Sequence, residues 1–287
     1  NDIVLGTHGR ALWILDDIGP LRQLAAAQAA STAYLYQPAA AYQLPRNAYS
    51  DTQLEPEFPA GQNPPSGAII DYLLKPGSTG PVTLDILDAA GKLVRHFSST
   101  DQAPTVDPNT LNFPTYWLRA PQILSAQPGM HRFVWNLLYP SPPSLEPHAP
   151  MGVIYGDTPM GLTGVPVLPG QYTVKLTAGG QTLTRSLTVR ADPRVDKPMA
   201  GLEQQFQLGM QLSTDIARTY TALRQAKGKE NLGLRKLNGE LIAQYNSLYG
   251  GSYGGDGDNP STMATPTTQQ VAAVAELRQR VDAMLGQ

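Results

Sequence analysis

Cysteine is absent from this 287-residue chain, and its absence excludes disulfide bonds, thiol nucleophiles and thiolate metal sites. Charged residues are also scarce, at 15% of the sequence, and the net charge is only −2. This balance provides no basic surface for nucleic acid or for an anionic membrane. No apolar run approaches the roughly 20 residues of a membrane-spanning helix. We therefore expect neither a nucleic-acid partner nor a membrane span.

Proline and glycine are abundant instead, with 26 and 27 residues, which favours turns and strands over a wholly helical fold. The length suits about two domains of roughly 150 residues each, enough to bury a core without disulfides. Strand-like alternation dominates as far as about residue 192, and a helical period follows it. We predict a fold that is mainly β with an α-helical tail.

Two apolar runs open the chain, IVLGT at 3–7 and ALWIL at 11–15. A two-residue Gly9-Arg10 loop would join them through a type II′ turn and would pair Gly6 with Trp13. A loop at His8-Gly9 is a competing register. In either register both faces of the hairpin are apolar, whereas a surface hairpin alternates apolar and polar residues. These strands must therefore be covered on both sides, as strands between neighbouring propeller blades are.

The stretch DIVLGTHGRALWILDDIGPLRQL resembles the last blade of bacterial sortilin-like, Asp-box (bacterial neuraminidase repeat) β-propeller proteins, which are often labelled glycosyl hydrolases. In that family a linker, an immunoglobulin-like domain and a helical tail follow the propeller. The resemblance implies that residues 1–24 are the last strands of a truncated propeller. The rest of that propeller would lie upstream and pack against them in cis. It also implies a periplasmic or secreted location.

Residues 25–66 are rich in proline and alanine, and we predict a linker there, interrupted too often for a helix. Short extended pieces are expected around Tyr34–Tyr36 and Tyr42–Leu44. From 67 to 192, strands of period two alternate with Gly/Pro turns, which is typical of a β-sandwich. The words VTLDILDAAGKLVRHF, GMHRFVWN and LPGQYTVKL resemble the immunoglobulin-like domain of flagellar hook-capping proteins and secretion-tail modules. Two insertions, about 98–127 and 137–167, depart from that pattern and read as long loops. The expected shared core is Ile86, Phe133, Trp135, Tyr172 and Val174.

Residues 193–287 carry three apolar stripes of helical period and predict a small antiparallel helical bundle. The first stripe runs from Leu202 to Leu223 and includes Ser213 and Tyr220. The second runs from Leu234 to Leu248. The third helix is expected to start near Pro266 with Thr265 as its cap. The words DNPSTMATPTTQQVAAVAELRQRV resemble the tail of the same propeller family.

Residues that could carry chemistry are few. His8, Arg10, Asp16 and Asp17 could complete a binding cleft whose other wall is the upstream propeller. The sequence favours the simpler interpretation, in which His8 is a polar residue at the propeller rim and Asp16 and Asp17 are acidic strand-end residues. Tyr116 and Trp117 could stack on sugar rings or fold back onto the sandwich. Asp256 and Asp258 hint at a calcium loop but lack its ligand spacing. No G-x-S-x-G elbow or supported carboxylate pair occurs, so we expect no catalytic residue, metal or cofactor.

The sequence therefore favours a non-catalytic, C-terminal structural or interaction module of a large exported propeller protein. Its partners would be the upstream propeller and a protein or carbohydrate ligand. One alternative is an accessory part of a glycoside hydrolase or sialidase-like enzyme whose site lies in the propeller. Another is a carbohydrate-binding module. The hydrolase label is an analogy at the level of the fold.

Overall fold

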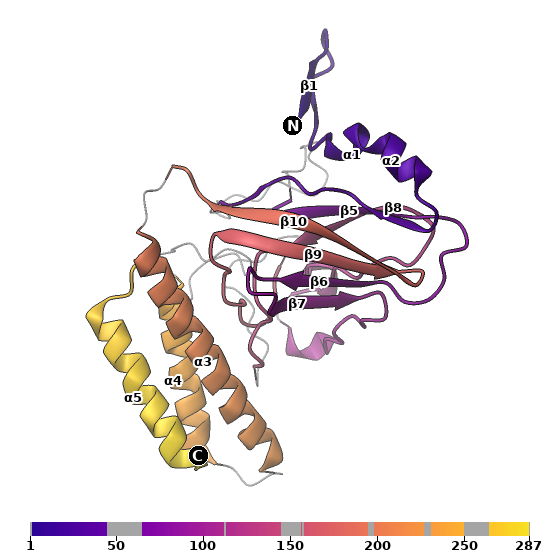
Figure 1. Ribbon diagram of the computed structural model, residues 1–287. Coiled ribbons are helices and arrows are strands. Elements are labelled where there is room, and N and C mark those ends of the chain that lie inside the picture. The colour runs from indigo at the N-terminus through magenta and orange to yellow at the C-terminus, as the bar shows by residue number, and fades with distance from the viewer. Residues whose placement is uncertain are drawn as a thin grey trace.

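The computed structural model describes residues 2–44, 65–111, 113–144, 156, 158–194, 198–226, 231–249 and 264–286. The fold is mainly β with a C-terminal helical part (Figure 1), as predicted. The first elements are β1 (Ile3–Gly6), β2 (Leu12–Leu15), α1 (Gly19–Arg22), α2 (Leu24–Ala29), β3 (Ala33–Leu35) and β4 (Ala41–Gln43). The sheet strands that follow are β5 (Ala68–Leu74), β6 (Thr83–Leu87), β7 (Leu93–Ser98), β8 (Gly129–Trp135), β9 (Gly170–Ala178) and β10 (Gln181–Ala191). Two 3₁₀ turns, η1 (Pro108–Thr110) and η2 (Thr115–Trp117), lie between β7 and β8.

Two sheets form the central domain. One has the strand order β3-β5-β8 and the other the order β4-β10-β9-β6-β7, with antiparallel neighbours except for the parallel pair β4 and β10. Every second side chain of β9 is buried, as the period-two pattern predicts. Apolar side chains from both sheets share one core. All five predicted core residues lie in it: Ile86, Phe133, Trp135, Tyr172 and Val174.

The predicted linker contributes strands to both sheets. β3 pairs with β5, and β4 pairs with β10. Ala33 and Leu35 are buried in the shared core while Tyr34 between them is partly exposed. The alanine-rich run also forms helix α2, because alanine has the highest helix propensity. The expectation that the linker contains no helix is therefore wrong at α2, whereas β3 and β4 lie where short extended pieces were expected.

The opening hairpin forms in a register that differs from both expected ones. Leu5 faces Trp13 and Gly6 faces Leu12, so the loop is His8–Arg10, one residue longer than expected. The backbone N–H and the hydroxyl of Thr7 both donate to the Ala11 carbonyl and close this loop. The expected pairing of Trp13 with Gly6 is wrong. Both faces of the hairpin are nevertheless apolar.

Three helices form the C-terminal part: α3 (Met199–Gln225), α4 (Leu232–Leu248) and α5 (Thr268–Leu285). The second stripe is buried as predicted, but the buried face of α3 includes Leu212, Asp215 and Thr219 rather than Ser213 and Tyr220. The helix α5 is capped by Thr267 instead of Thr265. Thr267 and Gln270 form a capping box, in which each side chain satisfies a backbone N–H of the other residue.

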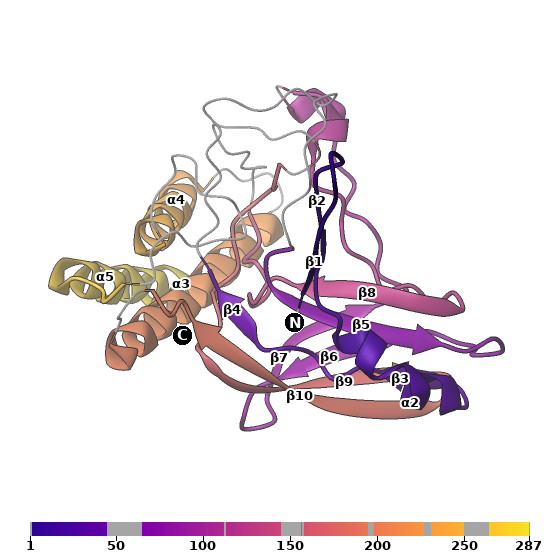
Figure 2. The same cartoon turned by 90° about the horizontal axis from the view of Figure 1, so that it is seen from above.

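The helices lie to one side of the two sheets, as the view from above shows (Figure 2). The loop between β8 and β9 joins the two parts, since Leu162 and Val165 belong to the helical core. The hydroxyl of Tyr245 on α4 donates to the Thr163 carbonyl at 2.6 Å. This loop therefore acts as a further wall of the bundle.

Candidate functional site

The hairpin β1–β2 points away from the rest of the molecule (Figure 1). His8 and Arg10 lie in the loop at its tip, and Asp16 and Asp17 lie at its base. The six steps along the backbone from Arg10 to Asp16 span roughly 20 Å in an extended strand. The structure therefore does not gather these four predicted residues into one site.

The base of the hairpin is held by local hydrogen bonds. The backbone N–H of Asp17 donates to Asp2 Oδ1 at 3.0 Å, and Asp17 Oδ1 accepts from the Gly19 N–H at 3.0 Å. Asp17 has a positive φ of 50°, a conformation that aspartate adopts more readily than most residues. The aspartates thus turn the chain from the hairpin into α1.

Sequence reasoning missed an ion pair that lies near this base. Arg132 of β8 binds Asp71 of β5 through two hydrogen bonds, Nε to Oδ1 at 3.0 Å and Nη2 to Oδ2 at 3.2 Å. The bonded Asp71 carboxylate raises the pKa of Arg132, and Asp17 and Asp16 add to this effect. Asp71 is only 3% exposed. The sequence could have indicated this ion pair, because Asp71 is a single acid within the apolar run AIIDYLL, and a buried charge needs a partner of opposite charge.

The hairpin surface is the most unusual feature of the described residues. We define it as the side chains of Ile3, Val4, Leu5, Leu12, Trp13, Ile14 and Leu15, whose exposed fractions run from 39% to 71%. Directly opposed residues of an antiparallel pair share a face. Ile3, Leu5, Trp13 and Leu15 thus form the first face, and Val4, Leu12 and Ile14 form the second.

The energy available at the hairpin surface is large. Weighted by exposed fraction, the seven side chains expose about four whole side chains, and burial of each contributes about 1.5–3 kcal/mol. Covering both faces would contribute about 6–12 kcal/mol, which is comparable with the roughly 4–15 kcal/mol that association costs. Burial of the hairpin surface can therefore offset the cost of association, and net affinity depends on the contacts that accompany it.

The remaining predicted residues form no site with the hairpin. Tyr116 and Trp117 lie on η2, where Tyr116 is 65% exposed and Trp117 is half-buried. Asp256 and Asp258 lie outside the described residues. Across the described ranges, no three His, Asp or Glu side chains are placed to hold a metal ion. None of the described helices combines the length and apolar character needed to cross a membrane.

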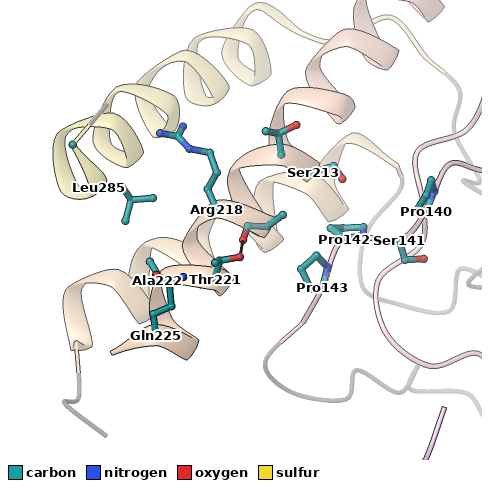
Figure 3. Close-up of a pocket in the computed structure, with 13 residues that line it drawn as sticks. Pro140, Ser141, Pro142, Pro143, Ser213, Arg218, Thr221, Ala222, Gln225 and Leu285 are labelled. Atoms are coloured by element: carbon teal, nitrogen blue, oxygen red, sulfur yellow. Dashed lines mark hydrogen bonds between the residues drawn. The ribbon is translucent and has the colours of Figure 1, made fainter. Parts of the chain in front are cut away.

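An open groove of about 810 Å³ lies between Pro140–Pro143 and the helices α3 and α5 (Figure 3). Arg218 lines it, but its guanidinium already binds Asp215 at 3.1 Å and Asp282 at 2.8 Å. Its charge is thus neutralised by two carboxylates. The groove offers mainly proline, small side chains and hydroxyls, with no free charge on Arg218 to select a ligand.

The pKa values of the two carboxyl groups bound by Arg218 are shifted in opposite directions. Burial raises the pKa of Asp215, which is 1% exposed, although Arg218 and Arg278 oppose the effect. The hydrogen bond from Arg218 lowers the pKa of Asp282. Arg278 also reaches both carboxylates, at 3.5 Å each. This cluster fixes α5 to α3, and we assign it a structural role.

Comparison with known proteins found no match for this chain among protein-family models, curated proteins or solved structures.

Proposed function

We propose that this chain is a non-catalytic structural and interaction module of a large exported Asp-box propeller protein, with the hairpin β1–β2 as its docking element. The observation that carries the proposal is the hairpin surface, whose seven large apolar side chains are exposed on both faces. Large apolar patches on folded proteins mark interaction sites. The neighbouring sheets of a propeller supply the two-sided cover that such a hairpin needs.

The two-sheet domain is, in this proposal, an immunoglobulin-like sandwich that carries the hairpin at one end. With β3 and β4 as a divided strand A, and β5, β6, β7, β8, β9 and β10 as B, C, C′, E, F and G, the sheets read A-B-E and A′-G-F-C-C′. This order fits an immunoglobulin-like sandwich without strand D. Tyr172, near the start of β9, donates its hydroxyl to the Leu168 carbonyl at 2.7 Å. That bond corresponds to the tyrosine corner of such domains.

The non-catalytic part of the proposal is supported by the separation of the polar candidates. His8 and Arg10 lie at the hairpin tip, and Asp16 and Asp17 lie at its base next to a salt-bridged arginine. General acid–base catalysis needs groups within hydrogen-bonding reach of one substrate atom. The pair at the tip and the pair at the base are therefore too far apart to act together on one substrate atom.

Two measurements test the proposal. The purified chain should show no turnover in glycosidase, sialidase, esterase and peptidase assays, with and without divalent metal. Turnover that is lost in Asp17→Asn and kept in the control Asp107→Asn would replace the module with an enzyme. The reading frame upstream of the Asn1 codon should encode further four-stranded Asp-box repeats. A stop codon there, or an unrelated fold, would contradict the propeller.

A further inference from the structure

We infer that the two-sheet domain and the helical bundle unfold as one cooperative unit, because a short ribbon between β8 and β9 belongs to the cores of both. We define the ribbon as residues 137–139 and 162–167. Two backbone hydrogen bonds hold its halves together, from the Tyr139 N–H to the Val165 carbonyl at 2.8 Å and from the Val167 N–H to the Leu137 carbonyl at 3.0 Å. The two halves thus form one structural element.

The buried side chains of the ribbon divide between the two cores. Leu137 and Val167 lie in the core of the two-sheet domain, whereas Leu162 and Val165 lie in the helical core. Val165 and Val167 are each 0% exposed, although a single residue separates them. A displacement of the bundle relative to the sheets would therefore remove one of these valines from its core.

Tyr139 joins the two cores directly. Its side chain packs against both of them, and the centre of its ring lies 5.6 Å from that of Phe206 on α3. On α4, the Tyr245 hydroxyl donates to the carbonyl of Thr163 in the ribbon. Both α3 and α4 are therefore bound to a segment that the two-sheet domain also binds.

Neither part can unfold alone without a penalty. Unfolding of the bundle alone would leave Leu162, Val165 and part of the Tyr139 ring in water on a folded two-sheet domain, and the exposure of apolar side chains is unfavourable. Unfolding of the sheets alone would release the ribbon, so that the bundle would lose one wall of its core and Tyr245 would lose its acceptor. Both partly folded states are thus destabilised, which is the condition for a single transition.

Native-state hydrogen exchange of the 287-residue chain in increasing urea measures both parts in one sample. We expect the slowest amides of β9 and of α4 to have equal protection and the same dependence on urea. Val274→Ala truncates a side chain of the helical core and should lower the protection of both sets by the same factor, about tenfold. Met284→Ala is the matched control, because Met284 is 51% exposed, and it should change each by less than about threefold.

The reciprocal variant is Ile86→Val, which removes one methyl group from the core of the two-sheet domain and is mild enough to keep the fold. It should lower the protection of the α4 amides by the same factor as that of the β9 amides. A fall confined to the part that carries the substitution, in either variant, would overturn the inference. So would wild-type α4 amides that exchange at least tenfold faster than those of β9.

Gly164→Ala tests the ribbon itself, because a Cβ at this position would collide with the Tyr139 carbonyl and force the two halves apart. Combined with Gly164→Ala, Val274→Ala should lower the protection of α4 at least threefold more than that of β9. Gly170→Ala is the matched control, since its Cβ meets no atom within 4 Å, and the two falls should stay equal there. Tyr139→Ser removes the side chain shared by the cores without a backbone collision and should separate the falls as Gly164→Ala does. Equal falls in both ribbon variants would show that the ribbon does not couple the two parts.

Discussion

Replacing Trp135 by alanine should strongly destabilise the two-sheet domain. The indole is completely buried, donates from Nε1 to the Leu138 carbonyl at 3.1 Å and packs edge-on against Tyr172 at 5.7 Å. Truncation of a buried tryptophan costs about 3–5 kcal/mol. The Leu138 carbonyl would also lose its donor, which places the expected loss at the upper end of this range. Trp135→Phe keeps a ring in the core and should lose about 1–2 kcal/mol, mainly from the hydrogen bond.

Hydrogen exchange of the β9 amides, with urea denaturation followed by circular dichroism, measures the effect within the sheet domain itself. Trp13→Ala is the matched control, because Trp13 is 64% exposed and a change at an exposed site stays within about 0.5 kcal/mol. A loss below about 1 kcal/mol for Trp135→Ala would place the indole outside the core and refute the reasoning. Equal losses at both tryptophans would refute it too.

Two further predictions concern the helices. Gly209→Ala should destabilise the helical bundle by about 1–3 kcal/mol, because the new Cβ would collide with the Tyr249 hydroxyl. Gly239→Ala is the matched control: its Cβ meets open space, and the variant should gain about 0.5–1 kcal/mol of stability. Thermal unfolding compares the two variants, and equal effects would contradict the close contact at Gly209. Asp215→Asn and Asp282→Asn should have opposite effects on urea stability at neutral pH. The raised pKa of Asp215 means that ionisation of its carboxyl lowers the stability as the pH rises above about 3.8, so Asp215→Asn should remove that loss. The lowered pKa of Asp282 means that its ionised carboxylate stabilises the fold above about pH 3.8, and this stabilisation is lost as the pH falls. Both variants should approach the wild type at low pH, and a shared sign at neutral pH would contradict the assignment.

The strands of the sheet domain could be predicted from the sequence, because one face of each strand is buried and its apolar residues therefore alternate with polar ones. Leu84 and Ile86 alternate with polar residues, and the structure buries both. The hairpin register could not be read in the same way. A one-residue slip normally moves apolar side chains to the wrong face and so reveals itself. In β1 and β2 both faces are apolar, and the pattern contains no information about register.

The hydrophobic pattern also could not predict the sheet pairing of very short strands or the burial of polar residues. β3 and β4 have three residues each, so the sequence predicted extended pieces there but had too short a pattern to show that they join the two sheets. Asp215 lies on the buried face of α3 because arginines on α3 and α5 bind its carboxylate. A search for apolar residues at helical spacing does not find such a buried acid. The cap of α5 was predictable in principle, since Thr267 is followed by Gln270 in the spacing of a capping box.

The insertion of the β8–β9 loop into the helical core sets an order for folding during synthesis. Leu162 and Val165 leave the ribosome before the helices α3, α4 and α5, with which they form one core cluster. The bond from Tyr245 to Thr163 closes across 82 residues, and contacts so distant in sequence form slowly. We therefore expect the nascent chain to keep these two apolar side chains unburied until its helices are made. A chain truncated before α4 would keep this apolar loop exposed, and we expect it to aggregate rather than to fold stably without the helices.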